Sequence, residues 1–156
     1  MNQQELKDFL DEKVLQYNTL DFIDSDPVQI PHRFSTKEDI EIAGFLAATI
    51  AWGNRKMIIN NANKMMNLIG NSPYDFVMNF SENDLDNLDG FVHRTFNSDD
   101  LKVFLTSLRH IYQNHGGLEN VFAQHQSSDS MQESISKFKQ TFFEIEHLPR
   151  TTKHVS

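Results

Sequence analysis

Residues 42–52, with the sequence IAGFLAATIAW, decide the fold because this stretch is apolar nearly all the way round a helix. A surface helix keeps one polar face, whereas a helix without a polar face is buried among other elements. The preceding residues, Ser35-Thr36-Lys37-Glu38, have the pattern of a capping box, which marks a helix start. We therefore predict a central helix that opens at this box, ends near Trp52 and is surrounded by other helices.

Helical periodicity recurs on both sides of this stretch. Apolar residues share one face in each of four further helices: Leu6, Phe9, Leu10, Val14 and Tyr17; Ile58, Ala62, Met65, Met66 and Ile69; Leu101, Phe104, Leu105, Leu108, Ile111 and Tyr112; and Met131, Ile135, Phe138, Phe142 and Ile145. Short helices are expected after Ser72 and Ser81 and over residues 118–125, and residues 19–34 read as a loop. With no convincing strand, we predict an all-α fold, an irregular multi-helix bundle in one helical domain over residues 1–156.

Composition narrows the class of protein. Thirteen Phe among 156 residues supply a large buried core, and the lack of Cys excludes disulfides, thiolate zinc sites and cysteine nucleophiles. The net charge of −8 argues against nucleic-acid binding by the whole surface but leaves room for a small basic face. No signal peptide and no membrane-spanning stretch is visible, so we expect a cytoplasmic protein without a membrane partner.

Motifs that complete a catalytic site are missing. The histidines, at positions 32, 93, 110, 115, 125, 147 and 154, form no i, i+4 pair with a third ligand, so structural or surface roles are expected and no metal or cofactor site is assigned. Gly116-Gly117 follows a helix instead of preceding one, which indicates a helix stop and not a phosphate loop. Whether the chain is an enzyme therefore stays open.

The polar corner after the central helix is the first candidate site. Trp52-Gly53-Asn54-Arg55-Lys56 joins two apolar helices, with Gly53 as an expected C-terminal cap and Asn54 as an expected N-cap. A helix N-terminus beside Arg and Lys favours anions. The alternative is an ordinary corner whose Arg55 and Lys56 are only solvated.

Two further segments place His and Arg beside an aromatic residue. These are His32-Arg33-Phe34 and His93-Arg94-Thr95-Phe96. Arg with aromatic rings suits phosphate contact and base stacking. The alternative is that the Phe residues anchor loops to the core while the Arg residues pair with nearby acids.

The same segments carry a family resemblance. Residues 26–34 (DPVQIPHRF), 39–55 (DIEIAGFLAATIAWGNR) and 91–96 (FVHRTF) resemble the N-terminal blocks of a bacterial family catalogued as domain of unknown function 2400. Members of that family resemble helix-hairpin-helix DNA glycosylases of the 8-oxoguanine type, which flip a damaged base out of the stack. The resemblance implies that Trp52, Asn54, Arg55 and Lys56 face DNA.

The resemblance also implies roles for the two His-Arg segments, and it implies that the catalytic residues of the family lie outside this chain. His32, Arg33, His93 and Arg94 would line the cleft or hold it together. The catalytic Lys and Asp belong to a later part of the family pattern, so the chain is expected to be an N-terminal fragment of a base-excision repair protein that binds DNA at full length. Two other interpretations stay open: a non-catalytic helical interaction module, including self-association through exposed apolar surface, and an enzyme with a small-molecule pocket between helices.

Overall fold

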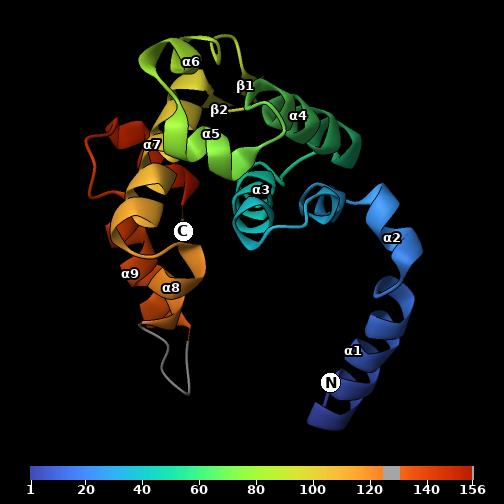
Figure 1. Cartoon of the computed structure of the whole chain (residues 1–156). Helices are drawn as coiled ribbons and strands as arrows, with labels where there is room; N and C mark the ends of the chain where they lie inside the picture. Colours follow the sequence, from blue (N-terminus) through green and yellow to red (C-terminus); the bar gives the residue numbers. More distant parts are fainter. Residues whose placement is uncertain (125–130, 156) are drawn as a thin grey trace.

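The structure is a computed structural model in which residues 1–124 and 131–155 are described, and it is mostly helical (Figure 1). The elements are α1 (Gln3–Tyr17), α2 (Leu20–Ser25), the 3₁₀ turns η1 (Pro27–Gln29) and η2 (Pro31–Arg33), α3 (Lys37–Thr49), α4 (Arg55–Leu68), α5 (Pro73–Asn79), α6 (Glu82–Asp86), β1 (Val92–His93), β2 (Phe96–Asn97), α7 (Ser98–Asn114), α8 (Leu118–Ala123), α9 (Gln132–Phe142) and η3 (Pro149–His154). The all-α class is confirmed. The predicted end of α8 at His125 lies outside the described residues.

Helix α3 lies among the elements that follow and precede it, as its apolar sequence predicts. It packs against η1, η2, α4, α5 and α8, and it buries Ile42, Ala43, Leu46 and Ala47. Its ends differ from the prediction. The N-cap is Thr36, whose hydroxyl donates to the Asp39 carboxylate at 2.6 Å instead of accepting from the backbone, so the expected capping box is absent. The helix ends at Thr49, before the corner, and not near Trp52.

Aromatic rings join α3 to the C-terminal helices. Phe104 of α7 and Phe142 of α9 have ring centroids 4.8 Å apart, and the Phe45 ring of α3 lies 5.8 Å from Phe104 and 5.4 Å from Phe142. Phe138 completes the group at 5.5 Å from Phe45. The rings meet in stacked, tilted and edge-on contacts, which combine large buried area with favourable quadrupole geometry. The predicted apolar faces of α7 and α9 thus meet in one core.

The N-terminal helix departs from the expected packing. Its N-cap Asn2 and Glu5 form a capping box, so the helix itself is locally encoded. However, α1 buries no residue, and its apolar side chains stay exposed, from 41% for Leu6 to 81% for Leu15. Figure 1 shows α1 projecting away from the helices around α3. The segment read as a loop, residues 19–34, instead forms α2 and both 3₁₀ turns, which begin at Pro27 and Pro31.

Two further elements were not expected from the sequence. Strands β1 and β2 form an antiparallel hairpin in which Val92 pairs with Asn97 and His93 with Phe96. After α9, which ends at Phe142 well before Pro149, the tail forms η3 and buries Thr151 and Val155. No helix among residues 1–124 and 131–155 combines the length and apolar content needed to cross a lipid bilayer.

Candidate nucleic-acid interface

The corner between α3 and α4 is shaped by its backbone. After α3, the chain turns through Gly53, whose φ of +111° is a conformation that side-chain-bearing residues rarely adopt. Asn54 then caps α4, because its Oδ1 accepts from the Met57 N–H at 3.2 Å. The Asn54 side-chain oxygen is therefore occupied by a backbone hydrogen bond, while the residues of the corner stay exposed to solvent.

Arg94 reaches the corner from the β1–β2 hairpin. Its guanidinium carbon lies 4.5 Å from the centroid of the Trp52 ring, a cation–π contact, and the Trp52 side chain remains partly exposed. The approach is close: a Cβ on Gly53 would lie 3.0 Å from Nη1 of Arg94. Arg94 itself has φ +56°, in the left-handed region that costs about 1–2 kcal/mol for a residue with a Cβ. Such strain, held by the surroundings, is typical of functional sites.

The buried His93 ring packs against the backbone of the corner. Its side chain is 1% exposed, and its ring nitrogens contact the Asn61 amide nitrogen (Nδ1, 2.9 Å) and the Trp52 carbonyl oxygen (Nε2, 3.3 Å). Since the amide donates to Nδ1 and the carbonyl can only accept, the neutral ring carries its proton on Nε2. His93 thus joins α4 to the corner backbone, and it is too buried to touch a ligand.

The C-terminal turn η3 closes the other side of the site. The buried carboxylate of Asp100 accepts from the Thr151 hydroxyl (2.8 Å) and from Arg150 Nη2 (3.1 Å), and it also caps α7 by accepting from the Asn97 N–H. Arg150 Nη2 donates in addition to the Thr95 carbonyl at 2.9 Å. One buried carboxylate therefore fixes η3 against the hairpin that carries Arg94.

A pocket of about 440 Å³ lies between these elements, lined by Thr49, Trp52, Thr95, Lys153 and His154. Burial lowers the pKa of His154, whose ring also packs edge-on against Phe96. Among residues 1–124 and 131–155, neither Arg94 nor Lys153 makes an ion pair. We name Trp52, Arg94, Arg150 and Lys153 the corner patch. It presents an exposed indole beside Arg94 and Lys153, which have no acidic partner among the described residues, and beside Arg150, which is paired with Asp100.

The other predicted residues lie around or away from this patch. Arg55 turns toward α2, with Nε 3.8 Å from Asp26 Oδ2 and its guanidinium 5.7 Å from the Phe22 ring. Lys56 is exposed on the first turn of α4. His32 and Arg33 lie in η2: His32 lines a separate pocket of about 230 Å³, and Arg33 contacts the neighbouring Phe34 ring.

Sequence reasoning missed the contribution of η3. Residues 150–156 show no capping or closing element, and they were interpreted either as a frayed terminus or as part of a longer pattern. Arg150 and Thr151 are held instead by Asp100, some 50 positions earlier, which no local pattern reveals. The basic run Arg150, Lys153, His154 was the one available signal.

The fold and the site together define a mostly α-helical protein with a basic, aromatic corner. Residues 26–156 match the family described as "Protein of unknown function (DUF2400)", so the chain belongs to the DUF2400 family. No curated protein and no solved structure matches the chain. Helices α1 and α2 precede the matched region, whereas the whole corner patch lies within it.

Proposed function

We propose that the corner patch contacts DNA, and that the chain is the N-terminal portion of a DNA-glycosylase-like protein of the base-excision repair type. The observation that carries the proposal is the stack of Arg94 on the exposed Trp52 ring at 4.5 Å, without an acidic partner among the described residues. An Arg in this setting can reach a phosphate, and the indole offers a face to an unstacked base.

The electrostatics of the patch support the same function. The chain as a whole carries −8, so it repels a polyanion over most of its surface. Asp100, the carboxylate that contacts Arg150, is buried and bound by η3, and Asp26 faces Arg55. Arg94 and Lys153 make no ion pair among the described residues, so their charges can attract a phosphate backbone to this face.

In this function the chain binds DNA and carries out no chemical step itself. None of its residues aligns with the catalytic Lys or Asp that the glycosylase resemblance implies. The chain would hold and orient the nucleic acid, and its strained hairpin would keep Arg94 in place without further ordering on binding.

Fluorescence anisotropy with a labelled DNA duplex tests the proposal. The chain is compared with the double variant Arg94→Ala/Lys153→Ala and with the matched control Lys7→Ala/Lys13→Ala in α1, which removes the same charge elsewhere. Each lost phosphate contact lowers the slope of log K against log salt by about 0.9, so we expect a loss of about 2 in the patch variant and little change in the control. Equal slopes and affinities in all three proteins would exclude the patch from binding.

A second candidate function is protein interaction through α1. None of its residues is buried within the chain, and its apolar side chains and those of α2 line a pocket of about 1040 Å³. We propose a second copy of this chain as the occupant, because the apolar face of one α1 matches that of another in a two-fold pair. Light scattering should then show a dimer that Phe9→Ser/Leu10→Ser converts to a monomer. A wild-type monomer at micromolar concentration would contradict this function.

A further inference from the structure

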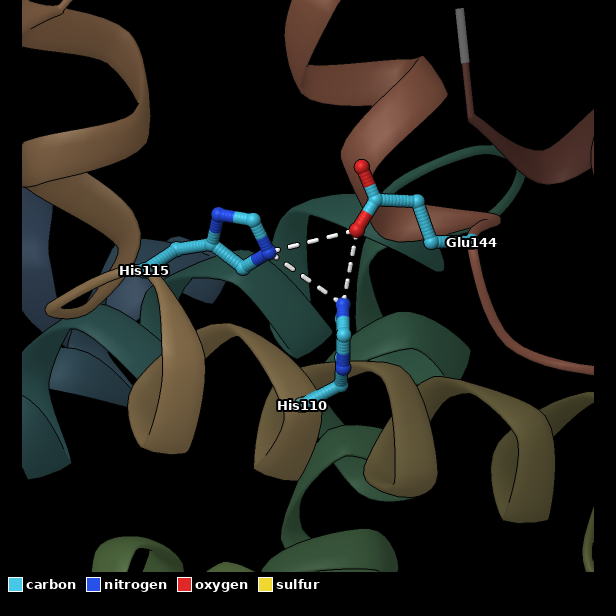
Figure 2. A group of neighbouring side chains, drawn as sticks. All are labelled: His110, His115 and Glu144. Carbon is cyan, nitrogen blue, oxygen red and sulfur yellow. Dashed lines mark hydrogen bonds and ion pairs between the residues drawn. The ribbon is translucent and has the colours of Figure 1, made fainter.

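Three side chains from different elements meet at the C-terminal end of α7. His110 lies on α7, His115 is its C-cap, and Glu144 follows α9. Figure 2 shows the three side chains converging on one point. Nε2 of His110 lies 2.8 Å from Oε2 of Glu144 and 3.2 Å from Nε2 of His115, and Nε2 of His115 lies 3.2 Å from the same oxygen.

These distances are close to those of three ligands on one metal ion. A tetrahedral Zn²⁺ with bonds of 2.0–2.1 Å places its ligand atoms about 3.3–3.4 Å apart. The observed triangle, with sides of 2.8, 3.2 and 3.2 Å, has to open by only a few tenths of an ångström to accept the ion. Two imidazole nitrogens and one carboxylate oxygen are also a donor set that zinc takes in proteins.

The local fold explains why the histidines meet. Positions five apart diverge on the surface of a continuous α-helix. Here α7 stops at Asn114, and the chain turns at Gly116, whose φ is +74°. The amide of Asn120 donates to the His115 carbonyl at 2.6 Å and holds this turn, so the His115 ring folds back beside His110.

The surroundings suit a metal ion that is reached from solvent. The three side chains are 25%, 28% and 47% exposed for His110, His115 and Glu144, which leaves a fourth position for water. The Asn114 amide nitrogen lies 3.1 Å from Nδ1 of His110, so the Asn114 side chain has to turn its oxygen toward Nδ1 when that nitrogen carries the ring proton.

We propose that His110, His115 and Glu144 form a binding site for a divalent transition-metal ion, with Zn²⁺ as the preferred ion and one coordination position open. Binding requires each imidazole to present an Nε2 lone pair, so the ring protons move to Nδ1, and the ion replaces the hydrogen bonds that now join the three groups. The ion would lock the end of α7 to the segment after α9. The site is independent of DNA binding, because His110 lies about 15 Å along α7 from Asp100.

Isothermal titration of the chelator-treated full chain with ZnCl₂ tests the site. We expect one ion per chain, and a loss of more than about 100-fold in affinity for His115→Ala and for the near-isosteric Glu144→Gln, because even outer-contact changes cost 10–100-fold. His32→Ala, in η2, is the control for incidental binding by other histidines. With Co²⁺ as the probe, the wild type should give the visible absorption of a four-coordinate site and Glu144→Gln should not.

Two results would overturn the proposal. One is the absence of saturable binding of a single ion. The other is binding of equal strength in wild type, His115→Ala and Glu144→Gln, which would place the ion elsewhere. Circular dichroism of each variant confirms the helical fold, so that a lost site is not mistaken for an unfolded chain.

Discussion

Replacing Gly53 with alanine tests whether the close approach of Arg94 shapes the candidate interface. The new Cβ would lie 3.0 Å from Nη1 and 3.4 Å from Cδ of Arg94. The end of this side chain is flexible and can move, so the contact displaces Arg94 from Trp52 instead of blocking the fold. The backbone cost is separate, since an L residue is strained at φ +111°.

The magnitude follows from the backbone conformation. A residue held in a sparsely populated region costs about 1–3 kcal/mol, and for a chain of this size each kcal/mol lowers Tm by about 2–4 °C. Gly90→Ala is the matched control, because Gly90 has φ +83° but no atom within 4 Å of an added Cβ. Both variants should lose stability in urea unfolding, and only Gly53→Ala should disturb Arg94.

Tryptophan fluorescence reports on the environment of the corner, because Trp52 is the one tryptophan of the chain. We expect Gly53→Ala to change the emission maximum and to weaken duplex binding in fluorescence anisotropy, while Gly90→Ala leaves both unchanged. If Gly53→Ala keeps the wild-type emission and DNA affinity, the contact between Arg94 and Trp52 does not define the interface, and the reasoning fails.

Three further predictions concern charge, packing and pH. Arg94→Ala alone should reduce the salt slope of DNA binding by about 0.9, measured by anisotropy from low to moderate salt, whereas Arg33→Ala should not. Phe142→Ala, which empties a fully buried ring site, should cost about 3–5 kcal/mol in urea unfolding, against less than about 1 kcal/mol for the exposed Ile135→Ala. Because the histidines lower the pKa of Glu144 from its ordinary 4.5, its stabilising effect is complete above that value and is lost as pH falls through the lowered pKa. Glu144→Gln should therefore be less stable than wild type near neutral pH without metal, and the difference should shrink in acid; a constant difference in pH-dependent unfolding would contradict this.

Local signals in the sequence predicted most helices well. The apolar faces of α4 and α7, the Asn54 cap and the short helix that begins after Ser81 all appear in the structure. Each depends on neighbours within one or two helical turns, so spacing alone reveals them. The hairpin was missed because strands of two residues show no alternation that can be recognised.

The candidate site could be predicted only in part. The sequence marked Trp52 and Arg94 in separate segments, but their contact depends on a turn at Gly53 and a left-handed residue in the hairpin. His32 and Arg33, which share the His-Arg-aromatic pattern of the hairpin, lie in η2, where they make other contacts. A short motif specifies residue type, and the packing of its segment decides which other residues it meets.

The sequence by itself determined that this chain is helical, that residues 42–52 lead from the core to a polar corner, and which family it belongs to, because periodicity, capping and motif order are local properties. Only the tertiary structure decided that Asp100 holds η3 against the hairpin, that α1 stays unburied, and that His110, His115 and Glu144 converge. The contacts from Asp100 to η3 and from His110 to Glu144 join positions some 30 to 50 residues apart. They follow from which surfaces bury together, a balance over the whole chain that no short segment contains.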